Sequence, residues 1–198
     1  MSAKRRDRAE EHRERIAQIV TDIISELGID GVTVRRVAER AGYSTTVVTH
    51  YFANKKDLLL YTYQSASKQS YQRVYQALMH DDSDLVAFVK ALAYADRPEY
   101  WRVYLAFFQF ALMDKNLLLE QERRTEDVRK MALEIMYKRG VKKSSPESNI
   151  AYNYTADLLI SIQGLGLQSI LHPSEWTYDK KEEFLEMIVS RCYSSLGV

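Results

Sequence analysis

Residues 33–52, TVRRVAERAGYSTTVVTHYF, contain two short helical segments separated by a glycine. Thr33 is a suitable N-cap for the first segment, and Ser44 for the second. Apolar residues of the first segment recur at the spacing of one helical face, at Val34, Val37, Ala38 and Ala41. Gly42 tolerates the positive φ that a tight turn requires. This pattern is typical of a helix-turn-helix, whose second helix enters the major groove of DNA.

Helical periodicity continues on both sides of this segment. A preceding helix is predicted from about residue 8 to residue 27, with an apolar stripe of Ile16, Ile19, Val20, Ile23, Ile24 and Leu27. A following helix is expected from residue 54 or 55 to about residue 79. Further helices are expected at about 85–94, 99–113, 117–139, 147–171 and 179–194. Since the chain has only 7 Gly and 3 Pro among 198 residues, an all-α fold is predicted.

Two domains are expected within this all-α fold. Residues 1–54 are predicted to form a three-helix DNA-binding domain with the helix-turn-helix at 33–52. Residues 55–198 are predicted to form a larger helical domain for ligand binding and dimerisation. The net charge of +1 favours no particular partner, so DNA affinity has to come from locally placed cations and backbone donors.

A cytoplasmic location is expected from the sequence. Cys192 is the only cysteine, which fits a reducing compartment. The amino terminus lacks the apolar stretch of a signal peptide, and no run approaches about 18 apolar residues, so no membrane partner is expected.

The second segment carries the side chains that a recognition helix needs. Small polar residues near its start, Ser44, Thr45 and Thr46, allow the backbone to approach base edges. Side chains suited to the flanking phosphates follow at Thr49, His50 and Tyr51. Lys55 combines a cation with the free N–H groups of a helix start, which suits a phosphate.

Other interpretations of these residues stay open at this point. Arg35 and Arg36 could reach a phosphate or a guanine edge, or one of them could be an ordinary solvated charge. His50 could be a surface residue without a role, and the ring of Tyr51 could serve mainly in packing.

Residues 42–59, GYSTTVVTHYFANKKDLL, resemble the TetR-family signature, and the resemblance covers about residues 12–60. The Ser-Thr-X-Val-Val-Thr-His-Tyr-Phe form and the later LLISIQGLGLQSILHP are similar to the choline-responsive, BetI-like branch. The resemblance implies base or phosphate contacts from Thr33, Arg35, Ser44, Thr45, Thr46, Thr49, His50, Tyr51 and Lys55. Many members have Gly at the position of Thr46 and Tyr at that of Thr49, so an operator sequence does not carry over.

A dimer is expected because one helix-turn-helix makes few base contacts, whereas two recognition helices about 34 to 36 Å apart match a duplex repeat. The two last predicted helices are apolar enough to pair with their symmetry mates. The expected interface residues are Tyr154, Leu158, Ile162, Leu165, Gly166, Phe184, Ile188 and Cys192. The alternative is that both helices complete the core of one chain.

Aromatic residues concentrate in YWRVYLAFFQF, residues 100–110. One face of this helix is expected to line a pocket for a small apolar or cationic effector, with cation–π attraction to a quaternary ammonium as one option. The expected lining residues are Tyr75, Trp101, Tyr104, Leu105, Phe108, Gln109, Leu112 and Gln163. The alternative is that the aromatic residues are ordinary core.

An enzyme is not expected, and no catalytic residue, metal site or cofactor is predicted. The four His are dispersed, and no P-loop, dinucleotide fingerprint or nucleophile elbow occurs. The resemblance implies a homodimeric repressor that leaves a palindromic operator when a small-molecule inducer binds. A helical effector-binding or adaptor dimer without DNA-binding activity is the alternative.

Overall fold

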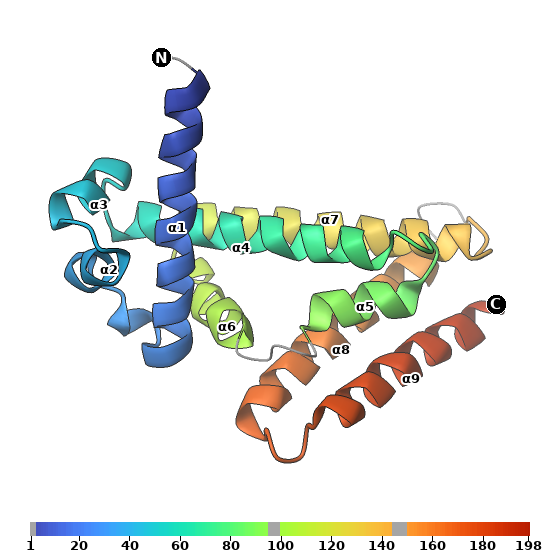
Figure 1. Cartoon of the computed structure of the whole chain (residues 1–198). Coiled ribbons are helices and arrows are strands. Elements are labelled where there is room, and N and C mark those ends of the chain that lie inside the picture. Colours follow the sequence, from blue (N-terminus) through green and yellow to red (C-terminus); the bar gives the residue numbers. More distant parts are fainter. Residues whose placement is uncertain (1–2, 95–99, 144–149) are drawn as a thin grey trace. The chain divides into compact units, whose positions relative to one another are not determined.

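The computed structural model describes residues 3–94, 100–143 and 150–198 (Figure 1). Side chains are described from residue 7 onward. Within these ranges the chain forms α-helices and one short 3-10 helix and no strand, which confirms the predicted all-α class. The elements are α1 (Ala3–Leu27), η1 (Ile29–Gly31), α2 (Val34–Ala41), α3 (Thr45–Tyr51), α4 (Lys55–Ala77), α5 (Leu85–Ala93), α6 (Tyr100–Ala111), α7 (Lys115–Lys138), α8 (Ile150–Leu171) and α9 (Tyr178–Leu196). The predicted starts at 99 and 147 lie outside the described residues.

Short polar side chains set several of the helix starts. The hydroxyl of Thr33 accepts a hydrogen bond from the backbone N–H of Arg36, and the carboxylate of Asp84 accepts one from Ala87. Each such bond satisfies a donor that the first turn of a helix leaves free. Local sequence therefore fixes where these helices begin.

The first of two compact units comprises the chain through Gln69 together with Arg102–Phe110. Its centre is the apolar stripe of α1, packed against α2 and α3. The core side chains of these elements, each 4% exposed or less, are Ile16, Val20, Ile23, Ile24, Val37, Ala38, Ala41, Val48 and Phe52. The predicted stripe is confirmed except at two positions, since Ile19 is half-buried and Leu27, at its end, is exposed.

The second unit comprises Ser70–Trp101 and Ala111–Val198. Within it α5 packs against α7, α8 and α9, and α8 also packs against α7 and α9. The buried side chains at these contacts are Leu85, Phe88, Val89, Ile135, Met136, Leu158, Ile162, Leu165, Leu185 and Val189.

Helix α4 is shared by both units, because its residues through Gln69 belong to the first and those from Ser70 to the second. The predicted domain boundary at 54/55 coincides with the start of α4 and not with a division between the units. None of the described helices is both long and apolar enough to cross a lipid bilayer.

Candidate nucleic-acid interface

The turn between α2 and α3 is built around Gly42. This glycine has φ +69° and ψ +30°, the left-handed conformation that residues with a side chain rarely adopt. Its backbone N–H donates to the carbonyls at the end of α2, and the N–H of Tyr43 donates to Ala38 at 2.9 Å. Together these bonds end α2 and redirect the chain into α3.

Helix α3 exposes polar side chains and buries little. Of its seven residues only Val48 is fully buried, with 1% of its surface exposed. The hydroxyl of Ser44 caps the helix by accepting from the N–H of Val47 at 3.4 Å. The exposed side chains of this segment, all of which were predicted to contact DNA, are Ser44, Thr45, Thr46, Thr49 and His50.

The Thr49 hydroxyl is engaged within its own helix. It lies 3.2 Å from the carbonyl of Thr45 and 3.1 Å from that of Thr46, so it donates its proton inside α3. In this rotamer Thr49 offers an oxygen acceptor and a methyl group to its surroundings, and not a donor to a phosphate.

Thr33, the N-cap of α2, and Arg35, in its first turn, are exposed, as a role in DNA contact requires. Arg36 is different, because its Nη1 donates to the carbonyl of Gly31 at 2.6 Å. Arg36 therefore connects η1 to α2. A guanidinium has five N–H donors, so this bond leaves others for DNA, and a DNA contact stays a prediction for both arginines.

Lys55 begins α4 and is exposed, while Asn54 caps this helix by accepting from the N–H of Asp57 at 2.9 Å. The Lys55 ammonium donates to the carbonyl of Ile29 at 3.1 Å. An ammonium has three donors, so this contact positions the cation and leaves donors for a phosphate.

Tyr51, the last residue of α3, is half-buried. Its ring centroid lies 5.4 Å from that of His50 and 5.7 Å from that of His12 on α1. The ring of Tyr51 can therefore pack against these neighbours while its hydroxyl remains available for a contact at the surface.

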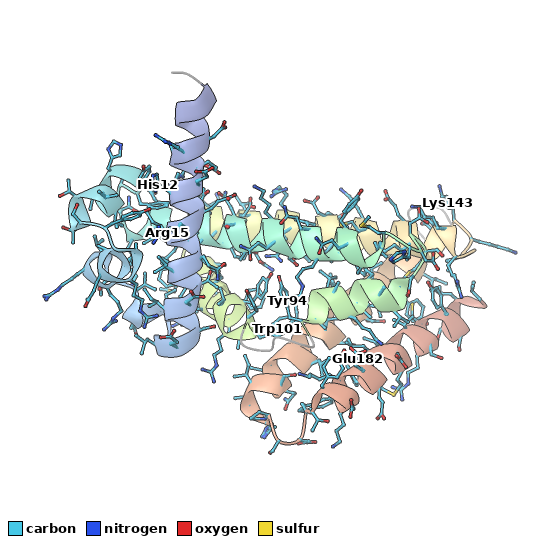
Figure 2. The ribbon with its side chains drawn as sticks, viewed as in Figure 1. His12, Arg15, Tyr94, Trp101, Lys143 and Glu182 are labelled. Carbon is cyan, nitrogen blue, oxygen red and sulfur yellow. The ribbon has the colours of Figure 1, made fainter. Side chains whose placement is uncertain are left out.

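Polar contacts from α1 to this region were not predicted from the sequence. His12 Nδ1 and the Tyr43 hydroxyl share a hydrogen bond of 2.6 Å, and Arg15 donates to the carbonyl of Ala41 at 3.2 Å (Figure 2 labels His12 and Arg15). No periodicity reveals such pairs, since they join positions 31 and 26 residues apart.

An ion pair further along α1 was also missed. Arg40 of α2 donates to both carboxylate oxygens of Glu26, at 3.1 and 2.6 Å. These hydrogen bonds lower the pKa of the Glu26 carboxyl below its usual range.

The residues predicted to line an effector pocket differ widely in burial. Trp101 and Tyr104 are buried, and Leu105, Phe108 and Gln163 are half-buried. Tyr75, Gln109 and Leu112 are exposed, with 72% of Tyr75 and 79% of Leu112 accessible. These last three side chains are open to solvent in the part of the chain that the structure describes, and a pocket lined by the whole set stays a prediction.

Trp101 has its ring and its N–H engaged within the second unit (Figure 2). The indole N–H donates to the carbonyl of Ala93 at 2.7 Å, and the ring lies against the backbone of Gly166, where a methyl group would overlap it. The guanidinium of Arg73 lies over the ring of Tyr94, 4.1 Å from the ring centroid. These two rings are therefore already in contact with groups of the chain itself.

Most residues predicted for the dimer interface are buried in their own chain. Leu158, Ile162, Leu165 and Cys192 are 2–4% exposed, and Gly166 is covered by Trp101. These five pack in the core of the second unit, where Leu158 and Cys192 also line a groove between α8 and α9, and a role in a dimer interface stays a prediction. The three that keep partial exposure are Tyr154, Phe184 and Ile188.

A different face of α8 is open, and it was missed because the helix is apolar on every side. Its exposed positions recur at steps of four and three, at Ile160, Gly164, Leu167 and Leu171. A methyl group on Gly164 would meet nothing within 4 Å. Beside this face, a groove of about 200 Å³ between α8 and α9 is lined by residues that include Tyr154, Ser161, Ile188 and Arg191.

The sequence of the helix-turn-helix matches a known family. A model of the bacterial regulatory proteins of the tetR family matches residues 21–62, which run from the second half of α1 into α4. The HTH-type transcriptional regulator BetI of Klebsiella pneumoniae (strain 342) is 35% identical over 57 residues. That alignment covers 29% of this chain and 29% of the relative's length.

Solved structures resemble the whole chain. A transcriptional regulator from Rhodococcus sp. Rha1 gives a TM-score of 0.81 at 24% identity, covering 92% of this chain and 96% of its own. The helix-turn-helix region of this chain is thus similar to the TetR family, and the likeness of the solved structures extends to the fold. A transcriptional regulator from Saccharomonospora viridis, crystallised in complex with choline, gives a TM-score of 0.71 at 21% identity, covering 91% and 96% of the two chains. The TetR-family model describes regulatory proteins, in agreement with the prediction that the chain is not an enzyme.

Proposed function

We propose that the protein is a homodimeric transcriptional repressor that binds a palindromic DNA operator through α3 and is released when a small molecule binds its larger helical domain. The observation that carries the DNA-binding role is the exposed hydroxyl-rich face of α3, which follows a helix-turn-helix turn and is next to Lys55. No Asp or Glu occurs between residues 40 and 56, so no carboxylate in this stretch repels a phosphate backbone. A protein acting on bacterial DNA works in the cytoplasm.

Selection of bound fragments from genomic DNA tests this role directly. The purified protein is expected to enrich a few fragments that share an inverted repeat, with half-sites about 10 bp apart or a multiple of that. Retention of no fragment at low salt would contradict the proposal and would favour an effector-binding adaptor dimer.

Dimerisation is supported by the open face of α8. Ile160 is 67% exposed and Leu171 is 57% exposed, and such a continuous apolar stripe is usually covered in a soluble protein. Gly164 lies within the stripe and allows a second helix to come close. We place this face against its symmetry mate, with the half-buried Tyr154, Phe184 and Ile188 at its margin.

The effector is proposed only as a chemical class, a small apolar or cationic molecule. Tyr104 and Phe108 of α6 are the aromatic candidates for contacting it. The choline complex of the Saccharomonospora viridis protein and the BetI relatives make choline the first compound to test. Saturating choline is expected to raise the melting temperature, since about 100 Kd of a ligand stabilises by about 2.7 kcal/mol. No thermal shift and no change in Trp fluorescence would exclude choline and leave the apolar class.

Helix α4 provides the route from effector to operator in this proposal. It is one continuous helix that includes residues of both compact units, so a displacement of this helix when the effector binds at α6 can alter the setting of its Lys55 end. A coupling free energy of about 1 to 3 kcal/mol would change operator affinity about 5- to 150-fold.

A further inference from the structure

Helix α1 contacts the recognition segment through His12. We propose that His12 and Tyr43 are positioning residues for DNA recognition, and that their hydrogen bond sets the orientation of α3. The inference rests on the proposed DNA-binding function of α3. Neither residue was among the predicted DNA contacts.

Tyr43 lies in the turn that connects α2 to α3. It follows Gly42 and precedes Ser44, the N-cap of α3, so a contact that holds Tyr43 also holds the first residue of α3 in position. Its hydroxyl shares a hydrogen bond of 2.6 Å with Nδ1 of His12, and the two rings meet edge to face at 71° with centroids 5.6 Å apart. Both the hydrogen bond and the ring contact hold the turn against α1.

Arg15, one helical turn after His12, reinforces the same contact. Its guanidinium donates to the carbonyl of Ala41 at 3.2 Å and lies 5.4 Å from the centroid of the Tyr43 ring. His12 and Arg15 of α1 therefore contact Tyr43 and Ala41, the residues on either side of Gly42. Figure 2 labels both on α1.

The imidazole of His12 reaches the other end of α3 as well. Its centroid lies 5.7 Å from the ring of Tyr51, the last residue of this helix. One side chain thus contacts the residue before the N-cap and the residue at the C-terminus of a seven-residue helix.

Apart from its packing against α2, helix α3 has few apolar contacts. Val48 is its only fully buried side chain, and the buried Phe52 follows at its C-cap, so polar and ring contacts from α1 add to a small apolar contact area. The His12 contacts lie near both ends of α3, and base readout depends on placing the donors and acceptors of α3 accurately in the groove. A small loss of orientation should therefore reduce operator affinity more than it reduces affinity for unrelated DNA.

The test compares Tyr43→Phe with Tyr61→Phe. Both variants remove one hydroxyl that bonds to a side chain of α1, since Tyr61 donates to Glu10 at 2.9 Å, but Tyr61 lies on α4 outside the helix-turn-helix. His12→Leu removes the partner of Tyr43, and His12→Asn restores a polar group near the position of Nδ1.

Backbone amide NMR shifts of residues 45–51 provide a readout that needs no DNA. We expect Tyr43→Phe and His12→Leu to move these signals clearly more than Tyr61→Phe does, and His12→Asn to recover part of the shift. Signals that stay in place in both variants would overturn the inference, whatever the outcome of DNA binding.

Fluorescence anisotropy with the selected operator and with a scrambled duplex provides the second readout. Tyr43→Phe should weaken operator binding about 3- to 10-fold, as expected for a hydrogen bond, with a change of less than about twofold for the scrambled duplex. The double variant His12→Leu/Tyr43→Phe should be no weaker than the worse single variant.

The outcomes separate the inference from the proposed function. Equal losses on both duplexes, or a lower melting temperature with unchanged operator affinity, would reduce the pair to a folding role and overturn the inference. A wild-type protein that binds no duplex, with the amide shifts as expected, would contradict the proposed DNA-binding function and leave the effect of His12 on α3 standing.

Discussion

The indole ring of Trp101 lies against Gly166 in α8, so close that it leaves no room for a methyl group there. The contact explains why glycine occupies a buried helical position, where it costs about 0.5–1 kcal/mol relative to Ala. The two glycines of the sequence GLG therefore differ in their surroundings, because a methyl group on Gly164 would meet no other atom within 4 Å.

Gly166→Ala is expected to destabilise the protein by about 1–3 kcal/mol, since the added methyl group displaces the Trp101 ring. Urea unfolding followed by Trp fluorescence measures the loss. Gly164→Ala is the matched control and should not destabilise the chain, because its methyl group meets nothing within 4 Å. Equal losses in both variants would show that the Trp101 contact is not the cause.

Ile160→Asp is expected to dissociate the proposed dimer, because it introduces a charge into the apolar face of α8. The dimer dissociation constant should rise at least about tenfold, corresponding to about 1.4 kcal/mol. Light scattering on a size-exclusion column measures this change. Met113→Asp, at an apolar site that is 86% exposed, is the control and should remain dimeric. A dimer in both variants would place the interface elsewhere.

Ser44→Ala should cost about 1 kcal/mol of stability through loss of the N-cap of α3, and it should also weaken operator binding. Thr177→Ala removes the cap of α9, whose bond to the N–H of Lys180 has the same length of 3.4 Å. The control should lose similar stability and keep its operator affinity. Thermal unfolding and anisotropy titration measure the two effects.

Thr45→Ala is expected to change sequence preference, because this exposed side chain opens the recognition helix. Binding selections on randomised half-sites measure the change. An unaltered preference would remove Thr45 from base readout.

Lys55→Ala should weaken binding to all duplexes and reduce the salt slope by about 1. Lys68→Ala, which removes another α4 cation, paired with Glu14 at 3.1 Å, should leave the slope unchanged. If the slope is the same in all three proteins, the contact of Lys55 with Ile29 is purely structural.

Cys192 is expected to be inert in the folded protein, because burial raises the pKa of its thiol from 9.0 to about 11. A disulfide reagent at pH 8 should modify it about 100-fold more slowly than in urea, since each pKa unit lowers the thiolate fraction tenfold. The unfolded thiol ionises first, so the free energy of unfolding should fall as the pH rises from 9 towards 11. Cys192→Ala should show a smaller fall over that range.

The sequence alone determined the features that depend on neighbouring residues. Caps at Thr33 and Ser44, the glycine turn at Gly42 and the periodicity of α1 are local, so the helix-turn-helix and its exposed hydroxyl face followed from them. The ends of most helices also followed within a few residues.

Only the tertiary structure decided which apolar faces are buried and which polar groups are engaged. Helix α8 is apolar all round, so periodicity could not distinguish the core residue Leu158 from the exposed Ile160. The engagement of Arg36 by Gly31, and of His12 by Tyr43, depends on how the helices pack, because a hydrogen bond forms wherever folding brings donor and acceptor together.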